Sequence, residues 1–254
     1  MGRAEAALIA VLVGIVAIAL VEAQPSSGAP TNLLYHYQTL VGGLLAIAGA
    51  VIGAIYINKQ IKSAERLELA RLASRREAAR AVLPLTLSSV AEYATDAGRA
   101  MLALMAQCEG ETLPPQVVMP TWPKLPTDAI TSLKELAENS RPNETLFVSR
   151  LLSAIQIQNS RIRDLEKELS GNRRSTIKVN LESYLIDAGE SYARATALFD
   201  YARREADHFP TQITWEGVRQ GVWLISVHSP SPDRVYESIG RLADGNLKGV
   251  VRNR

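Results

Sequence analysis

Cysteine and aromatic residues are scarce in this chain of 254 residues. The single cysteine, Cys108, excludes an internal disulfide and a zinc site built from several cysteines. We expect its thiol to be buried and inert. Aromatic residues make up only 6% of the chain, so the residue types that favour β-strands are few. Alanine and leucine dominate instead, and this composition predicts an all-α protein.

Charged side chains are absent from two long stretches near the N-terminus. Residues 6–21 contain no polar side chain, and in residues 40–57 the only polar side-chain atom is the hydroxyl of Tyr56. As helices they extend about 24 and 27 Å, close to the hydrocarbon thickness of about 30 Å. They predict a transmembrane hairpin over residues 1–57, with spans at about 4–23 and 38–57. For the first stretch, a cleaved signal peptide is the alternative.

Positive charge lies on one side of the second stretch. The connecting residues 22–39 contain no lysine or arginine, whereas a run of cations follows residue 57. The positive-inside rule then predicts a protein of the bacterial inner membrane with both termini in the cytoplasm. The orienting cations are Lys59, Lys62, Arg66, Arg71, Arg75 and Arg76.

Small residues share one helical face of the second stretch, namely Gly42, Ala46, Gly49 and Gly53. Such residues let two helix backbones approach closely. The pattern predicts close helix packing in the membrane, either within the hairpin or between copies of the chain. We therefore include a homo-oligomer among the expected assemblies.

The sequence beyond residue 57 predicts a cytoplasmic helical bundle in three parts. Residues 58–106 form a long helix that Pro84 kinks or restarts, and residues 107–126 are a proline-rich linker. A helical domain occupies residues 127–254. In the long helix, apolar residues at alternating spacings of four and three predict either a bundle core or an intermolecular coiled coil. They are Leu83, Leu87, Val90, Ala94, Ala97, Met101 and Leu104.

The helical domain carries several helix signals. Thr127 caps a short helix, and Pro142 begins a longer one that ends at Gly171 and has the polar Gln158 within its apolar seam. Residues 175–207 predict one long helix. Residues 214–227 fit a helix, although 222–227 alone would fit a strand. A last helix begins near Ser231-Pro232-Asp233.

No motif for nucleotide binding, serine hydrolysis or zinc proteolysis occurs in the chain. Glu205 and His208 have the spacing of a helical di-iron motif, but the second such motif and the two further glutamates are missing. The basic pair Arg173-Arg174 has no aromatic neighbours for base stacking. We therefore expect no enzyme, no catalytic residue, no metal, no cofactor and no nucleic-acid partner.

One segment resembles a known group of proteins. It begins at Tyr37 and ends at Gly43 with the sequence YQTLVGG, and a small-residue span and a helix rich in Glu, Arg and Ala follow. Over residues 35–105 the chain resembles uncharacterised bacterial inner-membrane proteins with an N-terminal two-helix transmembrane hairpin. The resemblance implies the same architecture and location, and it brings no known activity.

Together these patterns predict a membrane-anchored helical interaction or scaffold protein. Its expected partners are the lipid bilayer, further copies of itself and an unidentified cytoplasmic protein. The good helical seams and the lack of a convergent polar site favour this function. The alternative is an oligomeric pore-forming or membrane-stress effector, in which the glycine-lined second span packs around an axis.

Overall fold

The computed structural model describes residues 31–171, 176–227, 229 and 232–244, with side chains from residue 42 onward except that of residue 44. All regular elements in these residues are helices, so the predicted all-α class is confirmed. Contacts divide the chain into two compact units, Met1–Arg71 and Leu72–Arg254. The division falls inside a helix, and the proline-rich residues 107–126 lie within the second unit.

The longest helix, α2, comprises Thr31–Met105, so the apolar stretch and the charged stretch after it are one helix. It continues through Pro84, and the predicted restart at this residue is wrong. A proline inside a helix removes one backbone hydrogen bond. Leu83 and Leu87 beside it are fully buried, and this packing holds the helix on both sides of the proline.

None of the described helices is long and apolar enough to cross a membrane. The predicted span 4–23 lies outside the described residues. The predicted hairpin is therefore unsupported, and the predicted inner-membrane location is corrected by this finding.

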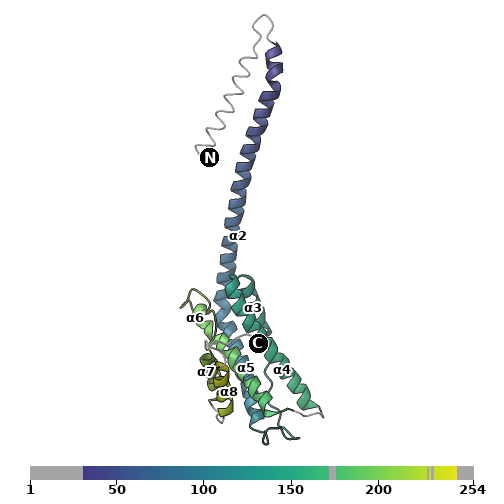
Figure 1. The fold of residues 1–254 in the computed structure, drawn as a ribbon, viewed down its shortest axis with the longest axis vertical. Helices are drawn as coiled ribbons and strands as arrows, with labels where there is room; N and C mark the ends of the chain where they lie inside the picture. Colours follow the sequence, from purple (N-terminus) through teal and green to yellow (C-terminus); the bar gives the residue numbers. More distant parts are fainter. Residues whose placement is uncertain (1–30, 172–175, 228, 230–231, 245–254) are drawn as a thin grey trace. The chain divides into compact units, whose positions relative to one another are not determined.

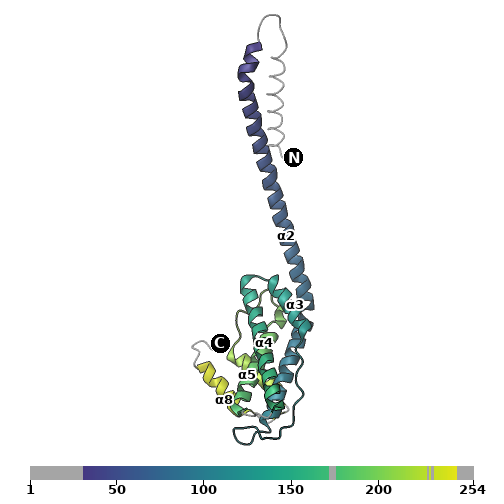
Figure 2. The same ribbon diagram turned by 90° about the vertical axis from the view of Figure 1, so that its right-hand side faces the viewer.

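The second unit is a bundle in which α5 has a central place. In Figure 2, α5 lies between α4 and α8, and it packs against both of them. Helix α3 packs against α4, and α7 packs against α5 and α8 (Figure 1). Besides α2, the helices are α3 (Thr127–Glu138), α4 (Pro142–Ser170), α5 (Lys178–Ala197), α6 (Phe199–Ala202), α7 (Trp215–Ser226) and α8 (Asp233–Asp244).

The core contains both apolar seams predicted from residue spacing. All seven seam residues of α2, from Leu83 to Leu104, are buried. Tyr93 and Ala100 are buried as well, so α2 is covered over more than a narrow stripe. The α4 seam from Leu151 to Leu169 is buried along its length. Because these side chains join one core within a single chain, the bundle alternative for α2 is confirmed.

Helices α5 and α7 approach each other closely at two glycines. A Cβ added at Gly221 of α7 would lie 2.7 Å from the carbonyl oxygen of Gly189 in α5. A Cβ added at Gly189 would lie 2.5 Å from Cγ2 of Val222. Only a residue without a side chain fits at this crossing.

Two predictions for the C-terminal half need correction. Residues 175–207 do not form one helix, because α5 ends at Ala197, α6 ends at Ala202, and Arg204 has a φ of 68° in the left-handed region. The strand alternative for residues 222–227 is also wrong, because they belong mostly to α7. The Thr214 hydroxyl caps α7 by accepting a hydrogen bond of 3.1 Å from the Gly217 N–H.

The proline-rich residues 107–126 are not helical, as predicted, but they are attached to the bundle. The Leu113 side chain is buried, and its N–H donates to the carbonyl of Thr176 at 3.4 Å. The Lys178 N–H donates to the Glu111 carbonyl at 2.8 Å. The segment therefore passes along the start of α5 as part of the second unit.

Candidate functional site

Large apolar side chains are exposed along the described part of α2 in the first unit. We call residues 45–61 the apolar segment. Single exposed apolar residues are ordinary on a protein surface, but a contiguous group indicates an interaction surface. A helix that is apolar on all sides is normally buried against other apolar groups. The exposed large side chains are Leu45, Ile47, Val51, Ile55, Ile57 and Ile61.

The four predicted helix-packing residues lie on or beside this segment. A Cβ added at Gly42, Gly49 or Gly53 would meet nothing within 4 Å, and Ala46 is exposed. The described residues therefore bring no other helix against this small-residue face. Its predicted role in close helix packing stays a prediction.

The six cations predicted to orient the chain have different surroundings. The Lys59 ammonium lies 5.8 Å from the centre of the Tyr56 ring, and Arg71 lies 3.9 Å from the carboxylate of Glu68. Lys62, Arg66 and Arg75 are exposed. Arg76 differs from the other five, because its guanidinium forms an ion pair inside the second unit.

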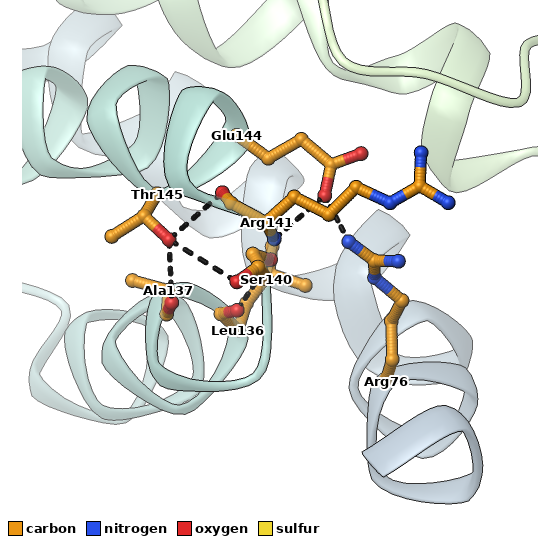
Figure 3. Close-up of polar contacts among 7 residues, drawn as sticks. All are labelled: Arg76, Leu136, Ala137, Ser140, Arg141, Glu144 and Thr145. Carbon is orange, nitrogen blue, oxygen red and sulfur yellow. Dashed lines mark hydrogen bonds and ion pairs between the residues drawn. The ribbon is translucent and has the colours of Figure 1, made fainter. Parts of the chain in front are cut away.

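Arg76 belongs to a group of polar contacts at the start of α4, which Figure 3 shows. Its guanidinium pairs with the carboxylate of Glu144, which also accepts a hydrogen bond of 3.0 Å from the Arg141 N–H. Glu144 is buried, so the pair is largely shielded from water. The Thr145 hydroxyl donates to the Ala137 carbonyl at 3.0 Å and joins the ends of α3 and α4.

One turn further along α2, Arg80 extends these polar contacts to α6 and the residues that follow it. Its Nε–H donates to the Tyr201 carbonyl at 2.8 Å, and its terminal nitrogen donates to the Ala206 carbonyl at 2.9 Å. The guanidinium also lies 4.1 Å from the centre of the Tyr201 ring. Burial raises the pKa of the Tyr201 hydroxyl. We call Arg76, Arg80 and their partners the polar junction.

Sequence reasoning missed the polar junction because it assigned Arg76 to membrane orientation. One signal was available. Arg76 and Arg80 are four residues apart and share a helical face with Leu83, the first residue of the buried seam. Cations on the same face as a buried seam can reach groups on neighbouring helices, as Arg76 and Arg80 do.

The residues with candidate chemistry do not converge. Glu205 and His208 follow the end of α6, so the predicted helical ExxH spacing is wrong. Within the described residues no three His, Cys, Asp or Glu side chains are grouped to hold a metal ion. The Cys108 thiol is only partly buried, and desolvation raises its pKa. A thiol with a raised pKa keeps its proton and is a poor nucleophile.

No protein-family model, curated protein or solved structure matches the chain. The resemblance to uncharacterised bacterial inner-membrane proteins therefore stays a prediction from the sequence.

Proposed function

We propose that this chain is a helical interaction protein that associates with a second copy of itself through the apolar segment of α2. The second unit is then a folded domain that each copy presents to other proteins. The observation that carries this proposal is the exposure of six large apolar side chains between Leu45 and Ile61 in one helix. Full burial of such a side chain contributes about 1.5–3 kcal/mol, so a few of them can support a dimer.

Residue size supports close contact between two such helices. The glycines at 42, 49 and 53 leave open space along one face, and branched side chains flank them. Small residues at this spacing let backbones approach, while the branched neighbours interdigitate.

Sedimentation of the full chain over a range of concentrations tests the proposal. We expect a dimer or larger assembly that Leu45→Asp combined with Ile57→Asp weakens by at least about tenfold, because these exposed side chains flank the small-residue face and each change places a charge in an apolar contact. The control is Leu85→Asp, which alters an apolar residue of the second unit that is 75% exposed. It should leave the assembly unchanged.

A second pair of variants tests the close approach. Gly49→Ile fills the small-residue face, whereas Gly43→Ile changes a glycine about 100° away on the helix. We expect the first change alone to weaken assembly. A chain that is monomeric at every concentration would overturn the proposal. So would a monomer whose apolar segment is taken up by phosphatidylcholine and phosphatidylglycerol vesicles, because lipid would then be the partner of this surface.

A further inference from the structure

An open groove of about 660 Å³ lies in the second unit among α4, α5 and α8. Helix α5 packs against the other two helices and lies between them in Figure 2. It therefore forms the floor of the groove, with α4 and α8 as the walls.

The lining residues follow the helices for several turns. On α4 they run from Leu146 to Arg161, and on α5 from Val179 to Arg194, at steps of three and four residues. At about 1.5 Å per residue, the lining stretches of α4 and α5 are each about 22 Å long. This length matches about four turns of a helix lying along the groove.

Apolar side chains in the groove are open to solvent. Leu146, Ile157 and Val179 are each about half exposed, although they line a concave surface. An amphipathic helix recognises such a groove through apolar anchors at spacings of three and four residues.

Some charged side chains in the groove have a partner of opposite charge, and others do not. The lining carboxylates have arginine partners: Glu182 lies 3.6 Å from Arg234, Glu190 lies 2.6 Å from Arg194, and Asp187 pairs with Arg161. By contrast, the lining arginines at 150 and 241 have no carboxylate partner among the residues that the structure describes. The groove therefore presents positive charge that its own acids do not balance.

Three buried polar atoms of the lining have no hydrogen-bond partner within the described part of the chain. They are the Nε–H of Arg150 and the indole N–H of Trp215, which are donors, and Oε1 of Glu182, which is an acceptor. Trp215 is 6% exposed and lines the groove. A buried donor without an acceptor costs about 1–3 kcal/mol, so an incoming carboxylate or carbonyl oxygen would relieve this cost.

We propose that the groove binds an acidic amphipathic helix of a partner protein. Its apolar stripe contacts Leu146, Ile157 and Val179, and its carboxylates pair with Arg150 and Arg241. Charge complementarity selects this partner, because a basic helix would face two uncompensated arginines. The proposal concerns the second unit and does not depend on self-association of α2.

Fluorescence anisotropy of the full chain with labelled peptides tests the proposal. The probe is a peptide of about five helical turns with leucine on one face and glutamate on the flanks, and its counterpart carries lysine in place of glutamate. We expect the acidic peptide to bind and the basic one to bind at least about tenfold more weakly. A peptide of the same acidic composition in scrambled order should also bind weakly, because it has no apolar stripe.

Matched variants locate the binding. Arg150→Glu and Arg241→Glu should each weaken the acidic peptide by about tenfold, whereas Arg163→Glu changes an exposed arginine of α4 outside the groove and should not. Ile157→Asp should also weaken binding, with Leu85→Asp as its control. The indole N–H resonance of Trp215 should shift when the acidic peptide is added.

Three results would overturn the proposal. The acidic helix does not bind, it binds no better than the basic or scrambled peptide, or Arg163→Glu weakens it as much as Arg150→Glu. Circular dichroism of each variant separates a lost fold from a lost site.

Discussion

Gln158 places an amide inside the α4 seam. Its side chain is 2% exposed, and neither its amide nitrogen nor its amide oxygen has a partner among the described residues. Ala97 and Met101 of α2 lie beside it without a polar group, and the side chains of Arg161, Tyr184 and Asp187 line the same small cavity without bonding to the amide. A buried amide of this kind destabilises the fold relative to an apolar residue of similar size.

We expect Gln158→Leu to raise the free energy of unfolding by about 1 kcal/mol, because the change removes the unpaired amide and keeps the volume. Urea denaturation gives this value. Gln156→Leu, at an exposed position two residues earlier, should change it by less than about 0.5 kcal/mol. A clear loss of stability in Gln158→Leu would show instead that the amide selects the packing of α2 against α4.

Tyr93 of α2 predicts a pH dependence. Its hydroxyl is buried without a partner in the described residues, and desolvation raises its pKa. In the unfolded chain a tyrosine loses its proton near pH 10. The folded chain keeps this proton, so the unfolded state binds fewer protons and stability falls as the pH rises above about 10.

Tyr93→Phe should remove this part of the alkaline loss. Denaturant unfolding of wild type and variant between pH 8 and about 11 measures the difference in slope. Equal slopes for Tyr93→Phe and wild type would contradict the prediction.

At the scale of elements, the close crossing of α5 and α7 limits the size of the side chains that fit between these two helices. Gly221→Ala should lower the free energy of unfolding by about 1–3 kcal/mol, because the new methyl group meets the backbone oxygen of Gly189. Gly240→Ala, at an exposed position of α8 with open space around it, should raise it by about 0.5–1 kcal/mol. Thermal unfolding of both variants gives the two signs, and a stabilised Gly221→Ala would contradict the close contact.

The polar junction gives a second test at this scale. Arg76→Met leaves the buried Glu144 carboxylate without its guanidinium, and we expect a loss of about 2–4 kcal/mol. Arg75→Met removes an equal charge from an exposed neighbour and should cost less than about 0.5 kcal/mol. Urea midpoints of the two variants measure the difference. Equal midpoints would mean that Arg76 acts only as surface charge.

For the whole molecule, residue spacing predicted which helix faces are buried, but it did not predict the shape of the surface. The rhythm of four and three residues located the buried faces of α2 and α4, because burial on one side of a helix is a local property of its sequence. The groove was not foreseen. Its lining comes from α4, α5 and α8 together with Trp215 of α7, and whether these faces form a concavity depends on helix packing that no local pattern encodes.

The same reasoning explains the error at residues 175–207. Apolar spacing continues past Ala197, so one helix was expected, but α6 and the left-handed Arg204 turn the chain so that Tyr201 meets Arg80. The contact of Tyr201 with α2 is tertiary, and apolar spacing within residues 175–207 does not encode it. For the exposed apolar segment the sequence was informative in a different way. It showed that the segment is apolar, but it did not show which partner binds there.

The two units predict different hydrogen exchange along α2. In dilute solution, amides of residues 45–71 should exchange faster than those of residues 83–104, because only the latter are held by a core. Raising the protein concentration should protect residues 45–61 and leave residues 83–104 unchanged if copies associate there. Peptide-resolved mass spectrometry measures both, and equal protection at the lowest concentration would contradict the prediction.

The long-range contacts of α2 have a consequence for synthesis on the ribosome. Arg80 bonds to Ala206, which is translated 126 residues later. At about 5–20 residues per second, the interval is about 6–25 s. During that time the apolar seam of α2 has emerged before the helices that will cover it. The nascent polypeptide is therefore a natural client for chaperones that hold exposed apolar helices.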